Sequence, residues 1–186
     1  MFEMPRLSAR SKPARYRALA EALRSLLAGE RDFLANAANT AALLYHGLPR
    51  LNWVGFYRWL DGELVLGPFQ GKPACTRIRP GQGVCGTAVA RRATIVVPDV
   101  TAFPGHIACD PASRSEIVIP LIVGDRLLGV WDMDSPEPGR FDAEDQAGLE
   151  CLLEILLANS AWEGAPAPRG RSRARARRTD RDRVER

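Results

Sequence analysis

Two β-hairpins constrain the fold of this chain more than any other feature of its sequence. Asn52 to Leu60 is rich in aromatic and β-branched residues, and an Asp-Gly dipeptide suited to a tight turn joins it to Glu63 to Phe69. Further on, Gly124-Asp125 joins Ile117 to Val123 with Arg126 to Met133. This second pair is almost continuously hydrophobic, as strands covered on both faces are. The sequence therefore predicts an antiparallel sheet.

Helical periodicity accounts for most of the remaining sequence, because apolar residues recur every three or four positions. The predicted helices are Ala14 to Ala28, Asp32 to Tyr45, Val84 to Arg91 and Ala143 to about Trp162. The residues expected to face the core from the second and last helices are Phe33, Leu34, Ala37, Ala41, Leu44, Leu149, Leu152, Leu153, Leu156 and Leu157. With a brief strand at Thr94 to Val97, this order indicates an α+β domain whose helices pack against a central antiparallel sheet.

Length and charge predict one folded domain with two extensions. The chain has 186 residues, 46% of them hydrophobic, which suffices for one core. We expect an N-terminal extension over 1–13, a domain over 14–163 and a Pro/Arg-rich tail over 164–186. Nine arginines and three acidic residues give Arg169 to Arg186 a charge of +6, so the rest carries −2. Such a tail is expected to be disordered and solvated, with nonspecific contact to nucleic acid or anionic lipid as the alternative.

The chain is expected to be a soluble cytoplasmic protein. No run approaches the ~20 apolar residues of a membrane span, and the first residues lack the apolar core of a signal peptide. Its four cysteines are therefore interpreted as thiols rather than as a disulfide framework.

The four cysteines occupy different settings. Cys75 lies in Gly67 to Gly83, a stretch predicted to be irregular, and Cys109 lies in a loop of the length usually kept for function. Cys85 opens a predicted helix, where backbone N–H groups favour a thiolate. Cys151 belongs to an apolar helix and is expected to be an inert packing residue.

Three kinds of thiol chemistry fit these settings. A zinc site would need Cys75, Cys85 and Cys109 together with His106. The lack of a C-x-x-C pair argues against such a site. A Cys-His nucleophile would pair Cys109 with His106, although spacing alone cannot place a general base. A redox cycle would oxidise one cysteine to a sulfenic acid that a second cysteine converts to a disulfide, and it needs only two mobile thiols.

Acidic and aromatic residues form a second set of candidates. Glu116, Asp132 and Asp134 lie on or beside the second hairpin, and the strand period of two puts both aspartates on one face. Near a thiol they would raise its pKa, so their use would be to bind a substrate ammonium or to donate a proton. The alternative is a merely solubilising rim. Trp53 and Tyr57 lie on one face of the first predicted strand. They are either core aromatic residues or a wall of the site that contacts a methyl group of a ligand.

Six motifs give the chain a resemblance to a known family. They are Asn52–Tyr57 (NWVGFY), Gly71–Ile78 (GKPACTRI), Gly83–Ala88 (GVCGTA), Phe103–Asp110 (FPGHIACD), Ser113–Val118 (SRSEIV) and Asp132–Pro136 (DMDSP). In this order they resemble the free methionine-R-sulfoxide reductases, which are single GAF-domain enzymes, over about Asn52 to Phe141. The resemblance implies a GAF-like fold. A GAF-like pattern alone would indicate ligand sensing instead.

The resemblance also implies roles for these residues. Cys109 would attack the sulfoxide sulfur of free L-methionine-R-sulfoxide, and Cys75 would resolve the sulfenic acid as a disulfide, with Cys85 as an auxiliary partner. Thioredoxin would be the reductant, with no metal or organic cofactor, and a homodimer is a family expectation. In the same family Glu116, Asp132 and Asp134 would bind substrate and supply protons, and Trp53 and Tyr57 would surround the methylthio end.

Two features depart from the family pattern. Trp131 stands before Asp132 where a smaller aliphatic residue is usual, which puts the substrate geometry in question, and the family supplies no role for the Arg-rich tail. The alternative function is that of a non-enzymatic GAF sensor, which binds a small ligand in the same pocket and signals through cysteine oxidation. No output domain is recognised in the sequence, which disfavours the sensor.

Overall fold

The computed structural model describes residues 11–107 and 110–162, so Cys109, the predicted tail and most of the predicted N-terminal extension lie outside the described residues. The helices are α1 (Lys12–Leu26), α2 (Phe33–Gly47), α3 (Gly83–Arg91) and α4 (Ala143–Asn159), with a 3₁₀ turn at Val100–Ala102. The strands are β1 (Trp53–Leu60), β2 (Glu63–Gly71), β3 (Arg77–Ile78), β4 (Ile95–Val97), β5 (Ser115–Val123) and β6 (Arg126–Ser135).

The strands form one antiparallel sheet in the order β3-β2-β1-β6-β5-β4, which places β1 and β6 at its centre. The turn between β1 and β2 has positive φ at both Asp61 (51°) and Gly62 (85°), the backbone that an Asp-Gly hairpin requires. Both predicted hairpins and the α+β architecture are therefore confirmed.

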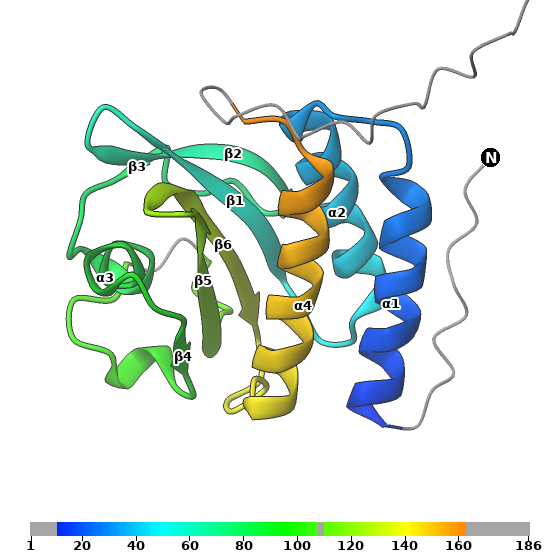
Figure 1. The fold of residues 1–186 in the computed structure, drawn as a ribbon. Coiled ribbons are helices and arrows are strands. Elements are labelled where there is room, and N and C mark those ends of the chain that lie inside the picture. Colours follow the sequence, from blue (N-terminus) through cyan, green and yellow to red (C-terminus); the bar gives the residue numbers. More distant parts are fainter. Residues whose placement is uncertain (1–10, 108–109, 163–186) are drawn as a thin grey trace, which may run out of the picture.

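The helices cover the two faces of the sheet unequally. Figure 1 shows α1, α2 and α4 together on one side and the short α3 alone on the other. The side chain of Asp142 caps α4 by accepting from the backbone N–H groups of Glu144 and Asp145. The thick helical layer builds the main core, while the α3 side carries a smaller hydrophobic cluster.

A buried carboxylate, Asp145, ties α1 to α4. Its Oδ1 accepts hydrogen bonds from Tyr16 Oη (2.8 Å) and Arg140 Nη1 (2.9 Å), and its Oδ2 lies 2.5 Å from Lys12 Nζ. Burial is the first cause of a raised pKa for Tyr16, followed by the Asp145 charge, so Tyr16 stays a hydrogen-bond donor. We call these four side chains the Asp145 cluster.

Alternation along the central strands separates the core from the α3 side. On β1, Val54 and Phe56 belong to the helical core, whereas Trp53 and Tyr57 belong to the α3 side. On β6, Trp131 lies in the helical core and its ring stacks on Phe56 at 5.3 Å between centroids. The prediction that Trp131 could reshape the pocket beside Asp132 is therefore wrong, because neighbouring strand residues point to opposite faces.

Three other expectations are also corrected. The stretch 67–83 is not wholly irregular, because β2 continues to Gly71 and β3 pairs with β2. Leu34 is 45% exposed, since it is about 100° around α2 from the buried Phe33. Cys151 is exposed rather than packed, because two residues beyond the buried Leu149 the helix has turned by about 200°.

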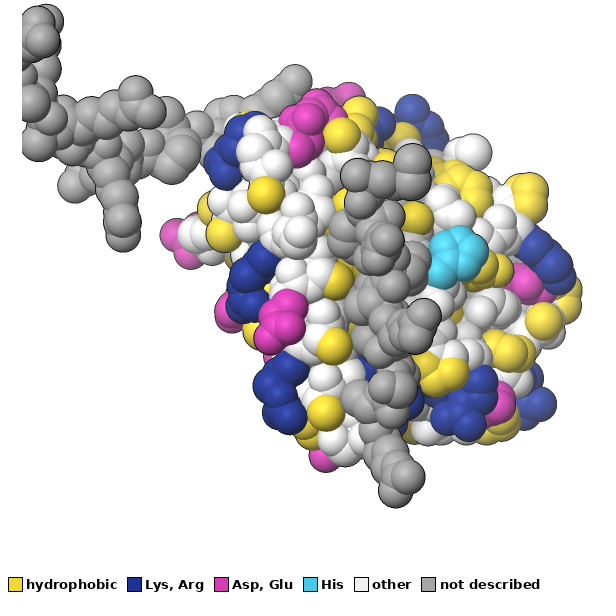
Figure 2. Space-filling model, turned by 90° about the vertical axis from the view of Figure 1, so that its right-hand side faces the viewer, with side chains coloured by type: hydrophobic (Ala, Val, Ile, Leu, Met, Phe, Trp, Pro, Cys, Tyr) yellow, Lys and Arg dark blue, Asp and Glu magenta, His cyan; other side chains and the backbone are white. Residues whose placement is uncertain are grey.

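The surface toward the α1 side is chemically mixed. In Figure 2, hydrophobic side chains lie among basic and acidic ones, without a large field of one kind. Within the described ranges, none of the helices is both long enough and apolar enough to cross a membrane.

Candidate active site

A cavity of about 30 Å³ lies between the sheet and α3. The residues that line it are Trp53, Tyr57, Ala74, Ile78, Gln82, Gly83, Val84, Cys85, His106, Ile107, Asp110, Ser113, Glu116, Asp132 and Asp134. The structure therefore brings together six of the eight residues predicted for the site. Of the other two, Cys75 directly follows the lining residue Ala74, and Cys109 lies outside the described residues.

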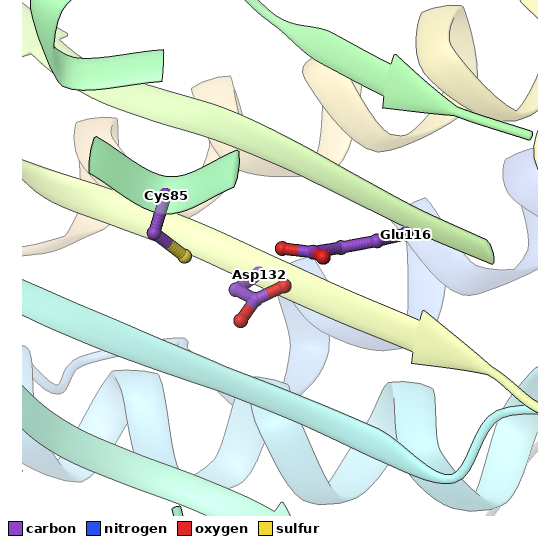
Figure 3. Close-up of side chains that lie close together, drawn as sticks. All are labelled: Cys85, Glu116 and Asp132. Atoms are coloured by element: carbon purple, nitrogen blue, oxygen red, sulfur yellow. The ribbon is translucent and has the colours of Figure 1, made fainter. Parts of the chain in front are cut away.

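Two adjacent strands present the three predicted carboxyl groups to this cavity. Glu116 on β5 is the cross-strand partner of Asp134 on β6, and Asp132 lies two residues before Asp134 on the same face. Cys85 reaches them from α3, so that one donor atom each of Cys85, Glu116 and Asp132 lies within 4.8 Å of the others. Figure 3 shows these three side chains converging from three elements.

The carboxyl groups of Glu116, Asp132 and Asp134, which we call the carboxyl cluster, are not balanced by a cationic side chain among the described lining residues. Burial, followed by the charge of Asp134, raises the pKa of Glu116. Burial, followed by the charge of Glu116, raises the pKa of Asp132. The pKa of Asp134 is raised by burial and then by Asp132. Among the described residues that line the cavity there is no lysine or arginine. The cluster therefore favours protonated carboxyls until a cation arrives.

Cys85 does not behave as its place in the helix predicted. It is the third residue of α3, yet burial and then the charges of Asp132 and Glu116 raise its pKa well above the usual value. The expectation that the helix start favours a thiolate here is wrong, because desolvation and like charge outweigh the helix dipole. In this form Cys85 is a thiol.

An aromatic wall lies beside the carboxyl cluster, because Trp53 on β1 is the cross-strand partner of Asp134 on β6. The rings of Trp53 and Tyr57 lie 6.0 Å apart between centroids, and Phe69 stacks on Trp53 at 5.5 Å. Gly55 lies between Trp53 and Tyr57 on β1, and a Cβ at this position would come within 2.3 Å of the Trp53 ring. The absence of a side chain at Gly55 therefore leaves room for the Trp53 indole. Trp53 Nε1 also donates to the backbone oxygen of Lys72 (3.1 Å).

Sequence reasoning missed a hydrogen-bonded rim beside the cavity. The carboxylate of Asp110 accepts from Ala112 N (2.9 Å), Lys72 Nζ (3.1 Å) and Asn52 Nδ2 (3.3 Å). Asn52 Nδ2 also lies 2.9 Å from Ser113 Oγ. The Ala112 N–H and then Lys72 lower the pKa of Asp110, so this carboxyl is ionised. Nothing in the spacing indicates this network, since Lys72 and Asp110 are 38 residues apart.

The two remaining candidates lie at the cavity's edge. His106 Nε2 is 3.5 Å from a Glu116 oxygen, and burial lowers the pKa of this histidine. Cys75 is partly buried, and its backbone oxygen accepts a hydrogen bond from Tyr57 Oη (3.1 Å). His106 therefore faces a carboxyl group, and the aromatic wall holds the segment that carries Cys75.

Comparison with known proteins agrees with this geometry. The GAF domain family model matches residues 14–157. The free methionine-R-sulfoxide reductase of Escherichia coli K12 is 56% identical over 142 residues, which are 75% of this chain and 86% of that protein. The enzyme of the same name from Saccharomyces cerevisiae is 44% identical over 136 residues, or 69% and 76% of the two chains.

A solved structure supports the same assignment. The free methionine-R-sulfoxide reductase of Neisseria meningitidis, in complex with its substrate, superposes with a TM-score of 0.81 at 47% identity and covers 86% of this chain and 95% of its own. Both the fold and the sequence thus agree with one group of GAF proteins. The chain belongs to the GAF domain family and, within it, to the free methionine-R-sulfoxide reductases.

Proposed function

We propose that this protein reduces free L-methionine-R-sulfoxide to L-methionine through its cysteines. The observation that carries the proposal is a cavity lined by two chemically distinct sets of side chains on one face of the sheet. One set is Glu116, Asp132 and Asp134, and the other is Trp53 and Tyr57 on the neighbouring strand β1. A free amino acid with a methyl sulfoxide side chain has matching parts, because its ammonium suits carboxylates and its methyl group suits aromatic rings.

In the proposed reaction, the Cys109 thiolate attacks the sulfoxide sulfur, and the oxygen passes to the cysteine. The products are methionine and a Cys109 sulfenic acid. Cys75 then attacks this sulfenic acid, which releases water and leaves a disulfide. Thioredoxin supplies the two electrons and two protons that regenerate both thiols. Cys85 is the auxiliary thiol that could replace Cys75.

The carboxyl cluster has two tasks in this scheme. The ammonium of the substrate provides a positive charge that the described residues lining the cavity do not supply, and it allows at least one carboxyl to ionise. A carboxyl that keeps its proton donates to the sulfoxide oxygen as the S–O bond breaks. The raised pKa values of Glu116 and Asp132 support this use, because a carboxyl of ordinary pKa holds no proton at neutral pH.

The cavity has to widen for this substrate. Its volume of about 30 Å³ holds about two water molecules, which is less than a free amino acid needs. The paired side chains at the rim, Lys72 and Asp110, are suited to such a movement. The Lys72 side chain is 68% exposed and that of Asp110 is 5% exposed, so Lys72 is the partner that can move away into solvent.

The test is thioredoxin-coupled oxidation of NADPH by the reduced full chain, with free methionine-R-sulfoxide and the S epimer compared. We expect turnover of the R epimer only. Cys109→Ser should abolish turnover, whereas Cys151→Ser, which changes an exposed thiol on α4, should leave it intact. Binding of the sulfoxide without turnover would favour the sensor. Sedimentation of the same sample tests the expected homodimer.

A further inference from the structure

Cys85, Glu116 and Asp132 form a compact donor set. Their sulfur and oxygen atoms lie within 4.8 Å of one another, and the side chains come from α3, β5 and β6 (Figure 3). The residues are 4%, 6% and 7% exposed, respectively. A donor set carried by three packed elements is held in place by the fold rather than by a loop.

The set is incomplete without a ligand. The Oδ1 atom of Asp132 is buried and has no hydrogen-bond partner among the described residues, although it lies at a cavity that polar groups line. Buried polar atoms in folded proteins are nearly always paired, so an orphaned carboxyl oxygen indicates a missing partner. Once Asp132 is ionised, its oxygens only accept, so the partner of the ionised form must be a donor or a cation.

Charge and size narrow the choice of partner. The described lining contains Asp110 and Asp134 in addition to Glu116 and Asp132, and the only side chain there that could become positive is His106. Burial lowers the pKa of His106, so it does not supply that charge at neutral pH. The volume of about 30 Å³ admits an ion with a water molecule. A small cation therefore fits the cavity as it stands.

The donor types select a zinc-like ion over magnesium or calcium. Magnesium and calcium take six or more oxygen ligands, whereas one sulfur and two carboxylates suit tetrahedral Zn²⁺. Zinc binds sulfur at about 2.3 Å and oxygen at about 2.0–2.2 Å, so the three side chains would close slightly around it. Three protein ligands leave one position for water.

We propose that Cys85, Glu116 and Asp132 bind Zn²⁺ and that the bound ion blocks the active site. The zinc replaces the thiol proton and any carboxyl protons, which pass to solvent, and no electrons are transferred. The ion occupies the place that the proposed function gives to the substrate ammonium, so zinc and sulfoxide compete. This blocking step rests on the proposed function, but metal binding itself does not.

Binding is tested with Co²⁺ as a spectroscopic probe on the reduced, chelator-treated full chain under argon. We expect one Co²⁺ per chain with a thiolate-to-cobalt charge-transfer band, and its displacement by Zn²⁺. Cys85→Ser should abolish the band and weaken Zn²⁺ at least about tenfold, since a first ligand matters no less than its supporting residues. Cys151→Ser should keep both. A wild-type chain without the band, or a band retained in Cys85→Ser, would overturn the proposal.

Blocking is tested separately on the wild-type chain. Zinc should raise the apparent KM for methionine-R-sulfoxide without changing kcat, and a chelator should restore the original KM. If cobalt binds through Cys85 but zinc leaves turnover unchanged, the blocking step is wrong while the metal site stands. If the metal-free chain has no turnover at all, it is the proposed function that fails.

Discussion

Two groups of buried acidic side chains lie on opposite sides of the same sheet, and they differ in whether basic side chains pair with them. Asp145, at the start of α4, has an arginine, a lysine and a tyrosine hydroxyl within 2.9 Å. Glu116, Asp132 and Asp134 lie beside one another, the Cys85 thiol, the Ser113 side chain and His106, with no lysine or arginine among the described residues that line their cavity.

This difference indicates that Asp145 has a structural role and that the carboxyl cluster has a functional one. A carboxylate with its cations holds two helices together, and removing it leaves the buried Arg140 without its charge partner, although Lys12 keeps Asp142. Carboxyls without a cation cost stability, and such groups concentrate at functional sites. We therefore expect substitutions in the two groups to have opposite consequences.

The largest effect is expected from the unpaired group. Asp132→Asn or Glu116→Gln should lower kcat/KM for methionine-R-sulfoxide by about 10²- to 10⁴-fold, the usual contribution of a general acid or base. The melting temperature should stay level or rise, because a neutral amide replaces a buried carboxyl group that has to be kept protonated. Asp125→Asn, at the turn of the same hairpin, is the control. A melting temperature that falls with the activity would mean that the group is structural.

The opposite result is expected for the paired group. Asp145→Asn should destabilise the chain by about 3–5 kcal/mol, because Arg140 and Lys12 lose their buried partner. Denaturant titration measures the loss, with Glu144→Gln in the same helical turn as the control. The molecules that remain folded should keep their kcat. A loss within about 1 kcal/mol, the value of a surface ion pair, would contradict this reading.

The pH dependence of stability should also differ in sign. The folded chain keeps protons on Glu116, Asp132 and Asp134 at pH values where the unfolded chain, with carboxyl pKa values of about 4, has lost them. Stability from this group therefore falls as pH rises above about 4. On the helical side, Lys12 lowers the pKa of Asp142 to about 2, so that contribution is lost as pH falls from about 4 toward 2.

Thermal melting over this pH range checks both signs. The double variant Glu116→Gln with Asp132→Asn should flatten the decline above about pH 4. Lys12→Met should remove stability that the wild-type chain retains near neutral pH. An unchanged slope in the double variant would show that these carboxyls titrate normally.

The smallest effect is expected at the rim. Lys72→Met should lower kcat/KM by no more than about fivefold, because Lys72 is largely exposed and Asp110 keeps its bonds to Ala112 and Asn52. Asp110→Ala should cost more. The comparison uses steady-state kinetics at low and high salt, and salt should weaken the wild type but not Lys72→Met. Equal salt dependence in the two proteins would exclude a role for the ion pair.

The parts of the fold that can be predicted from the sequence are those that depend on residues close together in the chain. The Asp-Gly turn and the alternation of side chains along β1 and β6 act over a few residues, so the sequence alone indicates them. β3 was missed because it has two residues, and only its pairing with Leu64 and Val65 makes it a strand. The exposure of Leu34 and Cys151 depends on which helix face meets a neighbour, and apolar composition does not determine that.

The candidate site also has features that the sequence predicts and features that only the fold reveals. That Asp132 and Asp134 share a face follows from strand geometry, and their meeting with Glu116 follows from the hairpin register. The pKa of Cys85 was predicted in the wrong direction, because the helix start is visible in the sequence whereas the surrounding carboxyls are brought there by other elements. The Lys72–Asp110 contact likewise joins loops that only the folded sheet brings together.

The alternation along β6 has a consequence for protein engineering. Trp131 and Met133 pack under the helices, while Asp132 and Asp134 face the cavity, so one strand serves the core and the site at alternate positions. Substitutions at the cavity-facing positions can therefore be screened for altered substrate range without repacking the helical core. Inserting or deleting one residue would be far more damaging, since it would turn the indole into the cavity and bury the carboxyls under the helices.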